Sequence, residues 1–123
     1  SIIKRMVKQR RRSCLEKFMK REVVVIPFPF SNLKGVKKRP ALVIADWGKE
    51  DIMLCQITSK AKHDGFEVEL KSSDFENGGL PIDSHIRPNK IFTATKTDII
   101  YTAGKINPKK YQEVINKLIH LVK

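Results

Sequence analysis

Two short segments of the sequence carry side chains suited to chemistry at a phosphate. In KKRPALVIA (residues 37–45) Arg39 directly precedes Pro40 and an apolar run, and Thr58 and Ser59 close the later run MLCQITS. A guanidinium beside hydroxyl groups can hold a phosphate or stabilise the charge that develops during phosphoryl transfer. Taken alone the pattern is weak, because an arginine near two hydroxyls occurs at many sheet edges.

The pattern of apolar residues predicts that these side chains lie at the ends of two paired strands. Residues 41–45 and 51–59 are rich in β-branched and apolar residues, and residues 47–50 between them have the composition of a turn. Antiparallel pairing brings the start of the first strand beside the end of the second. We therefore expect Arg39, Thr58 and Ser59 to share one rim of a hairpin.

The rest of the chain predicts a mainly β (α+β) fold. Further strands are expected at residues 23–30, 66–70 and 84–94, the last with a bend at Pro88, and ENGGLP (residues 76–81) indicates a chain reversal. Only the C-terminus has a clear helical pattern, with Asn107 suited to the N-cap and Pro108 to the first turn. We expect a small, strongly bent barrel or sheet of antiparallel strands closed by one C-terminal amphipathic helix.

Basic residues outnumber acidic ones, and most of the excess lies at the N-terminus. The 123-residue chain has a net charge of +12; residues 1–21 hold nine of its 25 basic and one of its 13 acidic residues, which gives this segment +8. The excess suggests a polyanionic partner. We predict a basic extension over residues 1–20, disordered or helical, and one domain over residues 21–123. The extension is either a phosphate-binding arm or a solvated segment ahead of a native start at Met19, and we favour the second.

Several classes of protein are disfavoured. No apolar run reaches the length of a membrane span and no secretory signal is recognisable, so we expect a cytoplasmic protein without membrane contact. Cys14 and Cys55 are too few for a disulfide framework, and His63, His85 and His120 form no metal-binding pattern with them. We therefore expect neither a metal nor a cofactor.

The order of the segments resembles the MazF/PemK toxins of type II toxin–antitoxin systems. The resemblance runs through REVVVIPFPF, KKRPALVIA, MLCQITS, FEVEL, GGLPIDSHIRPNKIFT, AGKI and the terminal helix, and it covers roughly residues 21–122. It implies an SH3-like barrel, usually a homodimer, that cleaves single-stranded RNA such as mRNA without a metal and leaves 2′,3′-cyclic phosphate and 5′-hydroxyl ends. It also implies a cognate antitoxin whose acidic, disordered C-terminal segment wraps the toxin.

The resemblance assigns roles to individual residues. Arg39 would be the central catalytic residue, with Thr58 and Ser59 as its partners. The general base is not identified, and His85 and Glu22 are the candidates for proton transfer. The residues expected to bind RNA around the same rim are Ser31, Lys37, Lys38, Gln56, Lys60 and Arg87.

Two positions depart from the family pattern. Many members open the first strand with glycine before an acidic residue, where this chain has Arg21 and Glu22, and Asn89 stands nearest to an aspartate proposed as a base in some members. An amide cannot serve as a general base. The alternatives are therefore a non-catalytic or gyrase-poisoning toxin of the related CcdB-like barrel, or a plain SH3-like nucleic-acid-binding module. The pair of Arg39 and Thr58 distinguishes a ribonuclease from these alternatives, because only a ribonuclease needs it.

Overall fold

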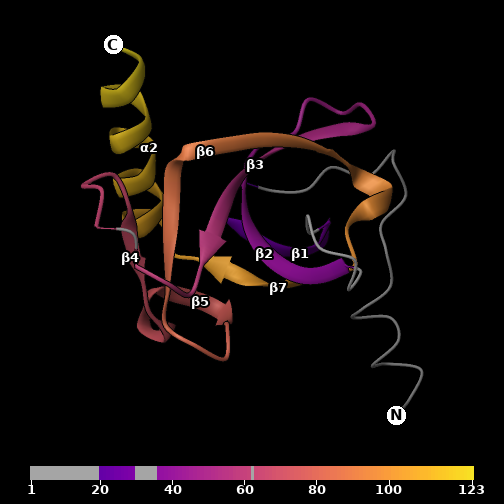
Figure 1. Ribbon diagram of the computed structural model, residues 1–123, viewed down its shortest axis with the longest axis horizontal. Helices are drawn as coiled ribbons and strands as arrows, with labels where there is room; N and C mark the ends of the chain where they lie inside the picture. The colour runs from indigo at the N-terminus through magenta and orange to yellow at the C-terminus, as the bar shows by residue number, and fades with distance from the viewer. Residues whose placement is uncertain (1–19, 30–35, 62) are drawn as a thin grey trace.

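A curled antiparallel sheet with one helix forms the body of the molecule, seen in a computed structural model that describes residues 20–29, 36–61 and 63–123 (Figure 1). Within these residues the sheet has seven strands in the order β4-β6-β3-β2-β1-β7-β5. The expected mainly β fold with a C-terminal helix is confirmed. The elements are β1 (Glu22–Pro29), β2 (Val36–Ala45), β3 (Asp51–Thr58), β4 (Val68–Leu70), η1 (Ser72–Asp74), β5 (Phe75–Gly78), β6 (Ser84–Thr95), η2 (Lys96–Asp98), β7 (Tyr101–Ile106) and α2 (Pro108–Val122).

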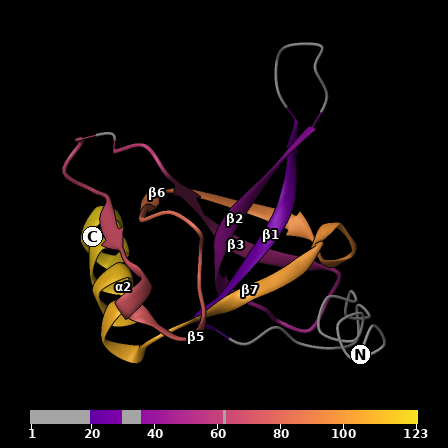
Figure 2. The same cartoon turned by 90° about the horizontal axis from the view of Figure 1, so that it is seen from below.

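The first three strands form consecutive hairpins, of which only the β2–β3 hairpin was expected from the sequence. β2 pairs with β3 in the register Ala41↔Gln56, and the turn between them is closed by the Gly48 N–H, which donates to Asp46 Oδ1 over 2.8 Å. Gly48 has a φ of 84°, which glycine adopts without steric cost. The far ends of β1 and β2 extend from the body of the protein as a two-stranded arm (Figure 2), in which Phe28 pairs with Lys37.

The sheet buries apolar side chains on both faces. Alternate residues of a strand point to opposite faces, so Leu42 and Ile44 of β2 pack in one cluster with Val114 of α2, whereas Ala41 and Val43 pack in a second cluster. The Phe28 and Phe92 rings pack against the second cluster and meet edge to face with their centroids 5.3 Å apart, which attaches the arm to β6. The arm that carries the basic segment of β2 is therefore fixed by core packing.

The predicted bend of the long strand is confirmed. β6 pairs with β3 along its length, but the ladder steps from Cys55↔Ile91 directly to Gln56↔Arg87, so residues 88–90 bulge out of it. Pro88 lies in this bulge, where the N–H that proline lacks is not needed for pairing. β6 turns sharply along its course (Figure 1), and its first part goes on to pair with β4.

Three segments differ from the sequence-based expectation. Of the strand expected at 66–70 only Val68–Leu70 is extended in the sheet, and the expected reversal at 76–81 begins with a strand, β5, that pairs with β7. β7 itself was not predicted. The extension at residues 1–20 lies outside the described residues apart from Lys20.

The C-terminal helix begins as predicted. Asn107 Oδ1 accepts the Lys110 N–H over 2.7 Å, and Pro108 occupies the first turn. No helix in the described ranges combines the length and the apolar character needed to cross a bilayer.

Candidate active site

A pocket of about 300 Å³ lies where the start of β2 faces the loop between β5 and β6. Val25 of β1, Ile57 of β3 and Tyr101 of β7 contribute apolar side chains to its lining. The loop contributes Leu80, Pro81 and Ile82. Its polar lining includes Lys37, Lys38, Arg39 and Ser59. The pocket therefore combines an apolar surface with a concentration of positive charge.

The hairpin of β2 and β3 brings Arg39 and Ser59 to this pocket. Arg39 pairs with Ile26 of β1, and Pro40 pairs with Val25. Ser59 directly follows the last residue of β3 and is exposed. The predicted meeting of Arg39 with the hydroxyl segment is therefore found, although Arg39 and Ser59 are 20 positions apart in the sequence.

Thr58 lies beside the pocket and does not line it. Its side chain is 7% exposed, and its Oγ1 accepts the Lys60 N–H over 3.2 Å. The β2–β3 ladder ends at Ala41↔Gln56, before it reaches Arg39 and Thr58, and Thr58 pairs with His85 of β6. Thr58 thus closes the turn that presents Ser59.

The two candidates for proton transfer lie outside the pocket lining. His85 Nδ1 is 3.4 Å from Glu67 Oε2, with the His85 side chain 22% exposed. Glu22 is buried and pairs with Lys105 of β7. It lies four residues along β1 from Ile26, the partner of Arg39, which is about 13 Å at the rise of a strand. Their proposed roles stay predictions.

The predicted RNA-binding residues divide into two groups. Lys37 and Lys38 line the pocket and are exposed, whereas Gln56, Lys60 and Arg87 are not in the lining. Gln56 is half-buried between Ala41 and Arg87 in the sheet. Lys60 is exposed in the turn after β3, and Ser31 lies outside the described residues.

Arg87 is held by an acidic residue. Its Nη2 donates to Asp64 Oδ2 over 3.0 Å, and only 13% of its side chain is exposed. Its Nε is buried and has no hydrogen-bond partner among the described residues. Asn89, the counterpart of the proposed basic aspartate, also lies near Asp64 Oδ2, with its Nδ2 at 3.4 Å.

The electrostatics of the pocket favour an anionic ligand. Lys37, Lys38 and Arg39 are consecutive along β2, and no acidic side chain is among the described residues that line the pocket. Clefts lined by one sign of charge concentrate ligands of the opposite sign. Among the described residues, no three histidine, cysteine, aspartate or glutamate side chains are grouped so that they could hold a metal ion.

The family model described as PemK-like, MazF-like toxin of type II toxin–antitoxin system matches residues 19–122. The chain belongs to this family. No curated protein sequence matches the chain. The resemblance read from the sequence is therefore confirmed at the level of the family, over almost the whole described structure.

Solved structures of MazF-like toxins share this fold. MazF from Deinococcus radiodurans is 20% identical with a TM-score of 0.68, and the match covers 87% of this chain and 97% of that one. A MazE–MazF complex from the same organism is 21% identical with a TM-score of 0.67, covering 84% and 94%. An endoribonuclease in complex with its cognate antitoxin, from a mycobacterial species, is 14% identical with a TM-score of 0.67, covering 86% and 95%.

The sequence did not reveal the other side of the pocket of this MazF-like chain. Leu80, Pro81, Ile82, Ser84 and Tyr101 line it. Ser84 Oγ donates to the Ile82 carbonyl over 2.9 Å and so holds the loop before β6. The only signal in the sequence was the apolar LPI after the two glycines of residues 78–79, in a segment predicted only as a chain reversal.

Proposed function

We propose that this chain is a toxin that acts as a metal-independent endoribonuclease on single-stranded RNA such as mRNA. The observation that carries the proposal is the position of Arg39 and Ser59 on one pocket, in a chain of the MazF-like family. Similar mycobacterial structures are named endoribonucleases, which supports the same activity here. The products would be a 2′,3′-cyclic phosphate and a 5′-hydroxyl.

The reaction uses a nucleophile that RNA itself supplies. The ribose 2′-oxygen attacks the adjacent phosphorus, the bond from phosphorus to the 5′-oxygen breaks, the 2′-hydroxyl loses its proton and the leaving oxygen gains one. The enzyme has to align these atoms and stabilise the additional negative charge. Arg39 can donate two parallel hydrogen bonds to the non-bridging oxygens, and Ser59 can orient the phosphate.

Arg39 is assigned charge stabilisation rather than proton transfer. A guanidinium stays protonated in proteins, so it is a very weak acid for the leaving oxygen. Of the two proton-transfer candidates, His85 is the nearer to Ser59, because His85 pairs with Thr58, which directly precedes Ser59. Glu22 lies toward the other end of β1.

The apolar side of the pocket gives the substrate a second point of contact. Tyr101, Pro81 and Ile82 line it opposite the cationic segment of β2. Single-stranded RNA exposes the faces of its bases, which bind aromatic and apolar side chains, while its phosphates bind cations. We propose that a base next to the scissile phosphate enters this pocket and that Lys37 and Lys38 contact the backbone.

Cleavage of a long single-stranded RNA in EDTA tests this function. The purified protein should cut the RNA, and mass spectrometry should find 2′,3′-cyclic phosphate ends. Arg39→Ala should abolish cleavage, and Arg39→Lys should also fail because an ammonium lacks the planar two-point contact. Lys49→Ala is the matched control, since it removes an exposed cation at the opposite end of the β2–β3 hairpin and should cut normally. Undiminished cleavage by folded Arg39→Ala would falsify the assignment.

The alternatives make a different prediction in the same assay. A gyrase-poisoning toxin or a plain nucleic-acid-binding module would leave the RNA intact while the wild-type protein stays folded. Inhibition of DNA gyrase by the protein would then identify the first alternative, and RNA binding without cleavage the second.

We further propose that the toxin works in the cytoplasm as a homodimer that a cognate antitoxin inhibits. The MazE–MazF complexes of Deinococcus radiodurans support such a partner. An acidic antitoxin segment would compete with RNA for Lys37, Lys38 and Arg39. Titration of RNA-bound protein with the neighbouring gene's product should release the RNA, and a ternary complex that still cuts would exclude direct competition.

The homodimer is tested separately. Light scattering should give the molar mass of two chains.

A further inference from the structure

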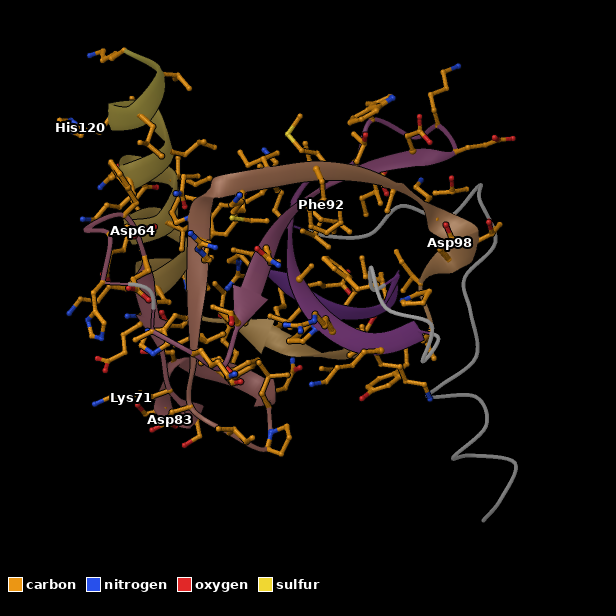
Figure 3. The ribbon with its side chains drawn as sticks, viewed as in Figure 1. Asp64, Lys71, Asp83, Phe92, Asp98 and His120 are labelled. Carbon is orange, nitrogen blue, oxygen red and sulfur yellow. The ribbon has the colours of Figure 1, made fainter. Side chains whose placement is uncertain are left out.

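The loop between β3 and β4 carries two acidic side chains that contact β6. Asp64 Oδ2 accepts the Arg87 Nη2–H over 3.0 Å, and Glu67 Oε2 lies 3.4 Å from His85 Nδ1. His85 and Arg87 are two residues apart on a strand, so their side chains point to the same face of the sheet. Figure 3 shows Asp64 in this loop, beside the C-terminal helix. The two acids therefore bind the loop to a single row of side chains.

The same two carboxylates also organise the loop. Asp64 Oδ1 accepts the Phe66 N–H over 3.0 Å, and Glu67 Oε1 accepts the N–H of His63. Each acid thus uses one oxygen within the loop and the other toward β6. Lys117 of α2 adds a third attachment, because its Nζ donates to the Gly65 carbonyl over 3.2 Å.

The contact between Asp64 and Arg87 persists at neutral pH. The Phe66 N–H, followed by the Arg87 side chain, lowers the pKa of Asp64 below its usual value, so the carboxylate stays charged. Arg87 is mostly buried and directs its Nη2 to this carboxylate. Its engagement favours a structural use of the guanidinium over the reading of RNA bases that the sequence suggested.

We propose that Asp64 and Glu67 are positioning residues that, through Arg87 and His85, hold residues 59–61 at the edge of the pocket. Ser59 starts this loop directly after β3, and Asp64 is the first of the two acids that tie the loop to β6. The effect on cleavage rests on the proposed endoribonuclease function. A shift of about 1 Å in an aligned group can lower a rate on the order of a hundredfold, so release of this loop should slow the chemical step.

Isosteric variants test the loop attachment in the full-length protein. Asp64→Asn and Glu67→Gln remove one charge each and keep an acceptor for the N–H groups of the loop. Each should lower the single-turnover cleavage rate at saturating protein by tenfold to a hundredfold, on the order expected for a misplaced group. Glu69→Gln is the matched control: it removes an exposed charge from neighbouring β4, where Glu69 lies 3.8 Å from Lys71. This control should cleave at the wild-type rate.

RNA affinity separates positioning from base reading. Binding is measured by fluorescence anisotropy with a 2′-O-methyl RNA that cannot be cleaved. For a positioning role, Asp64→Asn and Arg87→Gln should change affinity by less than about twofold, and the double variant should cleave no more slowly than either single one. If Arg87 contacts RNA instead, Arg87→Gln should weaken binding while Asp64→Asn, which frees the guanidinium, strengthens it. That result would overturn the proposal.

Hydrogen exchange tests the attachment independently of catalysis. The amide protons of residues 59–61 should exchange faster in Asp64→Asn and Glu67→Gln than in the wild type or Glu69→Gln, while the amides of β3 keep their protection. Unchanged exchange in both variants would overturn the proposal, and so would faster exchange with an unchanged cleavage rate. If the wild type cuts no RNA, the proposed function fails, yet the exchange measurement still decides whether these acids hold the loop.

Discussion

Arg21 and Glu76 form an ion pair, with Arg21 Nη1 2.5 Å from Glu76 Oε1, that joins the start of β1 to β5. The same Nη1 donates to the Ile106 carbonyl over 3.1 Å, which links β7 to the pair. Arg21 has a φ of 79°, in the left-handed region that favours glycine. Glycine would adopt this φ without steric cost, so Arg21 combines a backbone conformation that favours glycine with side-chain contacts that glycine could not make.

Substitution of Arg21 should separate the backbone cost from the side-chain gain. Arg21→Ala loses the ion pair and keeps the unfavourable φ, so we expect a loss of about 1 kcal/mol in the free energy of unfolding. Arg21→Gly loses the same pair but relieves a strain of about 1 kcal/mol, so its stability should lie close to that of the wild type. Urea denaturation measures both, and equal destabilisation of the two variants would contradict this explanation.

Gly104 should tolerate no side chain. A Cβ on this residue would lie 2.5 Å from the Asn77 carbonyl oxygen, across the β5–β7 ladder. Gly104→Ala should therefore push β5 away from β7 and cost more than about 2 kcal/mol, as overpacking does. Gly65→Ala is the control, because its Cβ would meet nothing within 4 Å and only its positive φ of 83° is unfavourable. Thermal denaturation should show a clearly larger loss for Gly104→Ala.

The buried ion pair of Asp46 and Lys96 should be sensitive to the loss of either partner. Lys96 Nζ lies 2.8 Å from Asp46 Oδ1, and the two side chains are 0% and 1% exposed. Asp46→Asn removes the negative charge beside a buried ammonium, so we expect a cost of about 3–5 kcal/mol. The double variant Asp46→Asn/Lys96→Met should be more stable than Asp46→Asn alone. A loss below about 0.5 kcal/mol for Asp46→Asn would argue against this account.

Cys55 should be unreactive in the folded protein. Burial raises the pKa of its thiol to about 12, against a weaker lowering by the backbone of Arg87. The thiol donates to the Arg87 carbonyl over 2.9 Å. The thiolate is the reactive form, so in a Cys14→Ser variant at pH 8 the thiol should react with iodoacetamide at least about a thousandfold more slowly than after unfolding. Fast labelling without urea would contradict the burial.

The same shift predicts how Cys55 affects stability at high pH. The folded state keeps the thiol proton to about pH 12, whereas the unfolded state loses it near the ordinary thiol value. The free energy that the buried thiol contributes to folding is therefore fully present below the ordinary thiol pKa. It is lost as pH rises from that pKa toward 12, because the unfolded state then gains stability by ionising. Urea denaturation between pH 8 and 10 should show a smaller decline for Cys55→Ala than for the protein with Cys55.

Deletion of residues 1–18 tests the basic extension. The pocket has its own cations in Lys37, Lys38 and Arg39, so we expect only a modest loss of RNA affinity. If the extension were an RNA-binding arm, its deletion would instead lower affinity steeply at low salt and make the dependence of binding on salt shallower. Anisotropy at several salt concentrations measures both effects. Loss of cleavage in a truncated protein that keeps its circular dichroism spectrum would show that the extension belongs to the functional site.

The sequence by itself determined the local part of this protein. The hairpin that brings Arg39 near Ser59 follows from two apolar runs and the turn at residues 47–50, and the helix start follows from Asn107 and Pro108. These features depend on neighbours within about 20 residues. Strand alternation, turn chemistry and capping act at that range, which is why pattern alone predicts them.

Only the tertiary structure decided which residues surround Arg39 in the pocket and which of the predicted RNA-binding cations is held by an acidic side chain. The curled sheet brings Tyr101 and the loop before β6 against the start of β2, and it pairs Arg87 with Asp64, 23 residues away. Glu22 stands at the start of β1, four residues from the partner of Arg39, and pairs with Lys105 of β7. Such contacts depend on how distant strands pair and how far the sheet bends, and bulges such as the one at residues 88–90 set both. No local pattern encodes that closure, because its energy is gained only when the whole sheet has formed.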